Sequence, residues 1–99
     1  MAKKKAKAGS NNPDAVKELG NKAFILKKYD EAIQHYTQAI EMTKDKPNHV
    51  YFANRANSKL EIFDFNGCVE DCDQAIQIEK TFIKSYLRKA KALQSLERF

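Results

Sequence analysis

Residues 17–24 read Lys-Glu-Leu-Gly-Asn-Lys-Ala-Phe, and this stretch decides the fold. Apolar residues recur in and around it at steps of three and four: Val16, Leu19, Ala23 and Leu26. That spacing predicts a helix with one packing face. Gly20 lies inside this helix, where glycine costs about 1 kcal/mol relative to alanine. We therefore expect a second helix to cross close to the backbone at Gly20, as in a tight helical hairpin.

A neighbouring strip of the same helix carries polar and aromatic groups. Lys17, Asn21 and Phe24 recur at steps of four and three, which places them on one side of the helix. The strip offers a cation, an amide and an aromatic ring to whatever lies opposite. We interpret it as a candidate binding surface.

Outward from this stretch, capping and breaking signals predict an all-α chain of five helices. The first runs from Pro13 to about Lys28, and the third begins near Pro47 and ends near Asp64. Polar residues that would cap helix starts stand at four places: Asn12, Asp30, Asn66 and Thr81. On the third helix the expected packing residues are Phe52, Ala56, Leu60 and Phe63.

An internal repeat relates these helices. A shift of 36 residues aligns Gly20 with Ala56 and Tyr29 with Phe65, and a further shift of 34 aligns Ala56 with Ala90. The repeating unit is a helical hairpin of 34 residues, lengthened by two in the connection at 43–48. Such a unit buries its apolar face only against a neighbour, so we expect an α-solenoid.

Length and charge allow one small domain. The chain has 99 residues and a net charge of +5, and four of the five charges come from the lysines at positions 3, 4, 5 and 7. We predict a disordered Lys-rich tail at 1–12 and a folded domain at 13–99, which is nearly neutral. We therefore expect no nucleic-acid binding. No apolar run approaches the ~20 residues of a membrane span, so we expect no membrane association and a cytoplasmic protein.

These spacings resemble the tetratricopeptide repeat, which has small residues where Gly20, Ala32 and Ala39 stand and an aromatic residue at Tyr29. The resemblance covers 13–99. It implies an antiparallel helix-hairpin solenoid of two full repeats and the first helix of a third, apparently truncated at its C-terminal end.

A narrower resemblance is to the carboxylate-clamp class of this repeat, found in stress-induced and heat-shock organising co-chaperones. That class has Lys-x-x-x-Asn on its first helix, Asn-Arg on its third and Lys-x-x-x-Arg on its fifth. The matching residues here are Lys17, Asn21, Asn54, Lys84 and Arg88. The resemblance implies a non-enzymatic co-chaperone module that holds the tail of a seventy- or ninety-kilodalton heat-shock chaperone, ending Glu-Glu-Val-Asp.

The chemistry of these residue types fits that ligand. A terminal aspartate presents two carboxylates, and holding both requires several cationic or amide donors that converge from different helices. By the same resemblance, three further residues are expected to line the peptide groove: Phe24, Asn57 and Lys91. Phe24 suits the valine side chain or a residue upstream of it, and Lys91 suits the upstream glutamates. Core packing for Phe24 and simple solvation for Lys91 stay open as alternatives.

The two cysteines and the acidic residues suggest no reaction. Cys68 and Cys72 are four apart at packing positions, which predicts buried reduced thiols. The histidines have no metal-ligand spacing to them, and no phosphate loop or nucleophile elbow appears, so we expect no cofactor, no metal and no enzyme. We interpret Glu70, Asp71 and Asp73 as a solvated acidic face.

Two other functions stay open from sequence alone. One is a structural scaffold whose groove packs a helix, or which self-associates through an uncapped C-terminal end. In that case Tyr86, Ala90, Leu93 and Phe99 would be partly uncovered. The other is nucleic-acid binding through the Lys-rich tail and the basic segment 80–99.

Overall fold

The structure is a computed structural model that describes residues 12–98, and all of its regular elements in that range are helical. The helices are α1 (Pro13–Ile25), α2 (Tyr29–Met42), α3 (His49–Glu61), α4 (Phe65–Ile78) and α5 (Ile83–Glu97). The predicted all-α fold of five helices is confirmed. Of the tail expected at 1–12, residues 1–11 lie outside the described residues, as does Phe99, so the division into a tail and a domain stays a prediction.

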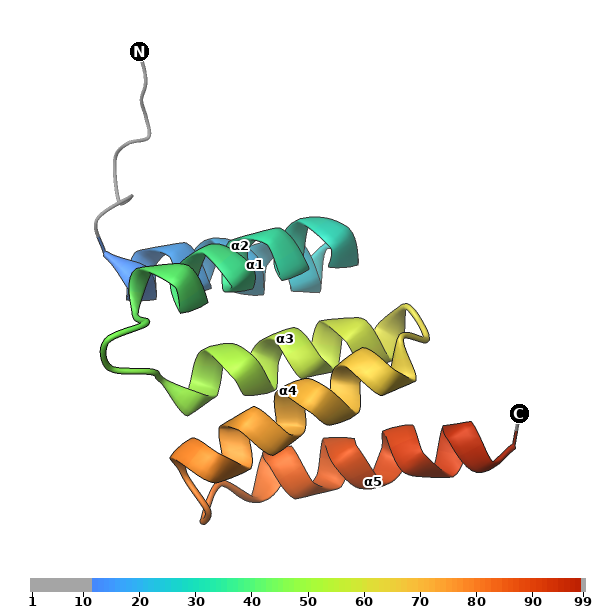
Figure 1. Cartoon of the computed structure of the whole chain (residues 1–99). Helices are drawn as coiled ribbons and strands as arrows, with labels where there is room; N and C mark the ends of the chain where they lie inside the picture. The colour runs from blue at the N-terminus through green and yellow to red at the C-terminus, as the bar shows by residue number, and fades with distance from the viewer. Residues whose placement is uncertain (1–11, 99) are drawn as a thin grey trace.

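The helices form an elongated stack of hairpins (Figure 1). α1 pairs with α2 and α3 pairs with α4, while α2 against α3 joins the two hairpins. α5 packs mainly on α4 and to a smaller extent on α3. This order places α3 between the first hairpin and α5. The extents of 47 × 27 × 17 Å are those of an open array, as expected for stacked repeats.

Gly20 marks the closest approach in the first hairpin. A Cβ atom added to Gly20 would lie 2.6 Å from Cε1 of Tyr36 on α2. The prediction that another helix crosses at Gly20 is therefore confirmed. Small residues also allow close helix packing in the rest of the core, where seven alanines and both cysteines are buried. Cys68 and Cys72 are free thiols with sulfurs 4.0 Å apart, as expected.

Three of the apolar residues expected to pack are instead exposed. Leu19, Leu26 and Phe63 keep 48%, 65% and 76% of their surfaces. Leu26 and Phe63 lie beyond the last residues of α1 and α3, in the hairpin turns. Each turn contains a residue in the left-handed region, Lys27 at φ 63° and Phe63 at φ 66°. These two residues are 36 apart, so the repeat extends to the turn backbone.

The expected cap of α1 is confirmed, and three other expected caps are wrong. Asn12 Oδ1 accepts hydrogen bonds from the backbone N–H groups of residues 14 and 15. α2 begins at Tyr29, one residue before Asp30. α4 is capped by Asp64, whose Oδ1 accepts from the Gly67 N–H at 3.0 Å, and Asn66 lies inside the helix. Thr81 donates its hydroxyl to Glu79 Oε2 at 2.5 Å instead of capping α5.

Asp71 corrects the prediction of a wholly solvated acidic face. It is 3% exposed and accepts from Arg55 Nε at 2.9 Å and Nη2 at 2.7 Å. Lys59 Nζ lies 3.0 Å from Asp71 Oδ2. Arg55 also donates to Thr37 Oγ1 at 3.1 Å, so one charged cluster joins α2, α3 and α4. Glu70 and Asp73 are exposed, as expected.

One face of α5 is open to solvent. Tyr86, Leu87 and Leu93 keep 45%, 60% and 44% of their surfaces, and Ala90 is exposed. This agrees with the expectation that this end of the array is partly uncovered. None of the helices between residues 12 and 98 has the length and hydropathy needed to cross a bilayer.

Candidate functional site

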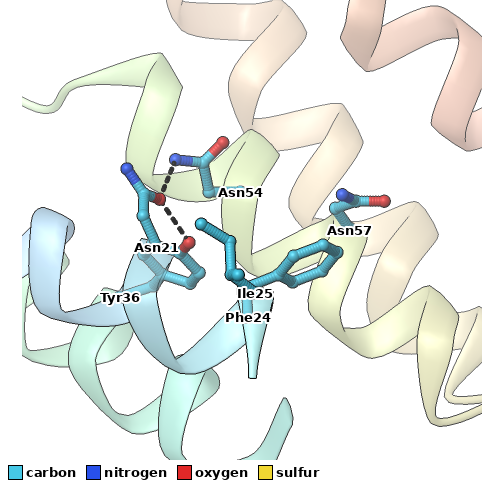
Figure 2. Close-up of a pocket in the computed structure, with 6 residues that line it drawn as sticks. All are labelled: Asn21, Phe24, Ile25, Tyr36, Asn54 and Asn57. Atoms are coloured by element: carbon cyan, nitrogen blue, oxygen red, sulfur yellow. Dashed lines mark hydrogen bonds between the residues drawn. The ribbon is translucent and has the colours of Figure 1, made fainter. Parts of the chain in front are cut away.

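The five predicted carboxylate-binding residues come from three helices. Lys17 and Asn21 lie one turn apart on α1, Asn54 lies on α3, and Lys84 and Arg88 lie one turn apart on α5. The side-chain amides of Asn21 and Asn54 are joined directly (Figure 2). Asn21 Oδ1 accepts from Asn54 Nδ2 at 3.4 Å and from the Tyr36 hydroxyl at 2.5 Å.

The donor groups of Lys17 and Asn21 already converge on one carboxylate in the structure. Asn21 Nδ2 donates to Glu18 Oε1 at 3.5 Å, and Lys17 Nζ lies 3.7 Å from Glu18 Oε2. The Glu18 side chain is 62% exposed, whereas that of Lys17 is 23% exposed. Two donors on α1 are therefore placed so that a carboxylate at the surface can contact both.

Arg88 joins α5 to this group. Its Nη1 donates to the Ala53 carbonyl at 2.9 Å, next to Asn54. Burial lowers the pKa of the Arg88 guanidinium, which still carries its charge at neutral pH because arginine titrates far above it. Burial, and then the charge of Glu18, raise the pKa of Tyr36 to about 12, while the charge of Arg88 acts in the opposite direction. Tyr36 is therefore a neutral hydroxyl at physiological pH.

Two open cavities flank Asn57. The first, of about 320 Å³, is lined by Asn21, Phe24, Ile25, Tyr36, Asn54 and Asn57 (Figure 2). The second, of about 440 Å³, lies between α3 and α5. Lys84, Arg88 and Lys91 line it beside the apolar Leu60 and Leu87, and Glu61 is its one acidic lining residue. The lining of the second cavity therefore carries a net positive charge, and the lining of the first contains no charged residue.

The remaining predicted groove residues take these positions. Asn57 lines both cavities, and Lys91 lines the second with Lys84 and Arg88. Phe24 lines the first cavity, but its ring also packs edge-on against Tyr29 at a centroid distance of 5.3 Å. Both interpretations of Phe24, as groove residue and as core residue, are therefore compatible with its contacts.

Sequence reasoning missed two kinds of residue at this site. Tyr36 was not among the expected site residues, yet its hydroxyl bonds Asn21. Ile25, Leu60 and Leu87 supply apolar cavity walls. By contrast, Arg55, adjacent to Asn54, bonds Asp71 and Thr37 and lines neither cavity, so it is not part of the site. The small residue Gly20 was the available signal for Tyr36, because it leaves room for that ring beside Asn21. Within the described range, no group of three His, Cys, Asp or Glu residues is placed to hold a metal ion.

Comparisons with known proteins agree with this architecture. No family model matches the chain. It is 43% identical over 89 residues to serine/threonine-protein phosphatase T of Trypanosoma brucei brucei, covering 90% of this chain and 18% of that protein. It is 40% identical over 77 residues to Hsp70-Hsp90 organizing protein 2 of Arabidopsis thaliana, covering 78% of this chain and 13% of that protein. The chain thus spans less than a fifth of the length of these curated relatives.

The chain covers a larger share of a solved structure than of these curated relatives. The first TPR of Spaghetti (RPAP3), bound to the HSP90 peptide SRMEEVD, superposes with a TM-score of 0.78 at 36% sequence identity. The match covers 89% of this chain and 71% of that chain.

Proposed function

This chain belongs to the family of tetratricopeptide-repeat (TPR) domains, and on that premise we propose that it is a peptide-binding module for the acidic C-terminal tails of heat-shock chaperones. The ligand is an extended tail ending Glu-Glu-Val-Asp, from the seventy- or ninety-kilodalton class. The peptide bound by the TPR of Spaghetti ends in the same four residues, and the Arabidopsis organizing protein is named for both chaperone classes.

The observation that carries the proposal is the convergence of donors from α1, α3 and α5. Asn21 and Asn54 share a hydrogen bond, Arg88 bonds the backbone next to Asn54, and Lys17 and Asn21 together contact an exposed carboxylate. A terminal aspartate supplies two carboxylates to such a donor set. In the proposed complex Lys17, Asn21 and Asn54 hold one carboxylate, and Lys84 and Arg88 hold the other.

The cavities would hold the residues upstream of the aspartate. The first is lined by Phe24 and Ile25, which suits the valine side chain. The second presents apolar walls with Lys84 and Lys91, which suits an apolar residue flanked by glutamates. Hydrogen bonds to charged groups contribute roughly 1.5–3 kcal/mol each before the costs of desolvation and ordering. We therefore expect a micromolar dissociation constant that rises with salt.

Calorimetric titration with the peptide Met-Glu-Glu-Val-Asp tests the proposal. Saturable binding should disappear when the peptide C-terminus is amidated and when the protein carries Lys84→Ala with Arg88→Ala. Lys80→Ala is the matched control, because it removes an exposed lysine that lines neither cavity. Absence of binding by folded wild-type protein, or equal binding of the amidated peptide, would rule the proposal out.

The same proposal makes this segment a binding module with no reaction of its own. Its likeness to the phosphatase covers 18% of that enzyme, which is too small a share to assign that enzyme's activity to this chain. We also propose a cytoplasmic location, because both cysteines are buried free thiols, which suit a reducing compartment.

A second candidate is self-association through α5. It is favoured by the exposed apolar side chains of Tyr86, Leu87 and Leu93. Sedimentation velocity over a range of concentrations tests it. The sedimentation coefficient of a monomer at every concentration would exclude this candidate and would leave the peptide-binding proposal untouched.

A further inference from the structure

We infer that Tyr36 is a positioning residue for ligand binding: its hydroxyl fixes the Asn21 side-chain amide so that the amide N–H groups face the ligand carboxylate. The inference rests on the proposed function, in which Asn21 donates to the peptide. Tyr36 comes from α2 and is outside the five predicted carboxylate-binding residues.

The position of Tyr36 is closely defined by α1. The side chain is 2% exposed, and its ring lies against the backbone of Gly20, the residue before Asn21. Any Cβ at Gly20 would overlap Cε1, Cζ and Cδ1 of the ring, at 2.6 to 2.9 Å. The ring is therefore buried in close contact with α1, and from there its hydroxyl reaches Asn21 Oδ1 at 2.5 Å.

Hydrogen-bond chemistry decides which side of the Asn21 amide faces outward. An amide has one accepting oxygen and one nitrogen with two donors. The Tyr36 hydroxyl and Asn54 Nδ2 both donate to Asn21 Oδ1, which occupies the accepting capacity of that oxygen (Figure 2). Asn21 Nδ2 then points the other way, to the exposed Glu18 carboxylate. A rotated amide would set two NH₂ groups against each other and would present an oxygen to the anion.

Removing one hydroxyl group tests this role. Tyr36→Phe keeps the ring against Gly20 and leaves Asn21 Oδ1 with the 3.4 Å bond from Asn54 alone. The amide then loses its orientation, and we expect the dissociation constant for the Met-Glu-Glu-Val-Asp peptide to rise about 3- to 10-fold. An unchanged dissociation constant in the folded variant overturns the inference.

Tyr51 is a matched control within the same chain. It is also 2% exposed, and its hydroxyl donates to Asp14 Oδ1 at 2.5 Å, away from both cavities. Tyr51→Phe should lower the melting temperature much as Tyr36→Phe does, and it should leave peptide affinity unchanged. An equal loss of affinity in both variants would mean that weaker binding follows from lower stability, against the inference.

A double-mutant cycle separates positioning from the shape of the groove. If Tyr36 acts through the Asn21 amide, Tyr36→Phe in an Asn21→Ala background should cause no further loss of affinity. The same fold-loss in both backgrounds would mean that the hydroxyl acts on the peptide by another route, and the inference would be wrong.

The side-chain amide resonances of Asn21 give a readout that needs no peptide. In Tyr36→Phe the Asn21 amide signals should shift, and the order parameter of the side-chain amide should fall. Changes at Asn54 should be smaller, and Tyr51→Phe should leave the Asn21 signals unchanged. Unchanged Asn21 signals overturn the inference. Failure of wild-type protein to bind the peptide would refute the proposed function, and the orientation of the amide would still be decided by these signals.

Discussion

Arg55 and Asp71 form a two-point ion pair between α3 and α4, with Nη2 and Nε lying 2.7 Å and 2.9 Å from the two carboxylate oxygens. Arg55 follows directly after Asn54, whose amide faces the first cavity. Neighbouring residues of one Asn-Arg pair therefore divide between two tasks, because successive side chains on a helix point in different directions. One lines the candidate site and the other joins the helices that position it.

Loss of the Asp71 carboxylate should destabilise the fold. Asp71→Ala leaves Arg55 and Lys59, whose side chains are each 18% exposed, without their shared partner. We expect the free energy of unfolding to fall by about 3 kcal/mol, as for other buried pairs that lose one member. Urea denaturation followed by circular dichroism measures it. The control is Asp73→Ala, which breaks an exposed pair with Lys89 and should cost less than about 1 kcal/mol. Equal costs in the two variants would contradict this account.

Lys84 and Arg88 should separate binding from stability. Lys84 is exposed, so Lys84→Ala should weaken peptide binding about 10-fold or more without changing the melting temperature. Arg88 is half-buried and donates to the Ala53 carbonyl, so Arg88→Ala should lower both affinity and melting temperature. Calorimetry and thermal melting on the same samples give both values. An Arg88→Ala protein with wild-type stability would show that the bond to α3 contributes nothing.

Glu18 should act as an internal competitor of the ligand. Its carboxylate contacts the Asn21 and Lys17 donors that the proposed complex requires, and its charge repels an acidic tail. Glu18→Gln should therefore lower the dissociation constant about two- to five-fold, the size expected of an exposed charge interaction. Titrations at low and high salt provide the check, because the gain should shrink as salt rises. Weaker binding by Glu18→Gln would mean that Glu18 helps to order the two donors.

Alkaline pH should unfold the protein through two tyrosines. Burial, then the charge of Glu18, raises the pKa of Tyr36 to about 12, and burial with the bond to Asp14 raises that of Tyr51 to about 12. Both values lie above the unfolded value of 10, so this stability is complete below pH 10 and is lost as pH rises to 12. Each tyrosine should account for about 2–3 kcal/mol by pH 12.

Urea denaturation at successive pH values measures this loss. The double variant Tyr36→Phe/Tyr51→Phe is the control, and it should lose less stability over the same interval. An identical loss in the variant would assign the alkaline transition to other groups.

Local periodicity predicted the helical hairpins well, because buried positions on a helix recur every three or four residues and small residues mark close helix contacts. The close crossing predicted at Gly20 illustrates this success. Helix starts were less predictable, since Tyr29 and Phe65 begin α2 and α4 ahead of the polar residues chosen as caps. The burial of Asp71 depends on Arg55 and Lys59, which lie on another helix. Such pairings depend on how two helices align, and spacing along one helix carries no information about that.

The same limit applies to the candidate site. Its five donor residues were found through a resemblance to a known class, and the structure places three of them in a connected group around Asn21, Asn54 and Arg88. The Tyr36 hydroxyl had no counterpart in the repeat, since the equivalent residue in the second hairpin is Cys72. A bond made once in the array leaves no periodic signal.

The arrangement of α5 bears on local opening as well as on binding. α5 packs chiefly on α4, and α1 packs chiefly on α2, so each of these helices has one principal neighbour. In arrays of this kind, helices with one packed neighbour exchange their amide hydrogens through sub-global opening more readily than helices packed on two sides do. A peptide held at one carboxylate by α1 and at the other by α5 would connect both helices to α3. Ligand binding would then slow hydrogen exchange in α1 and α5 together, and recognition of the tail would be coupled to the cooperativity of the five helices.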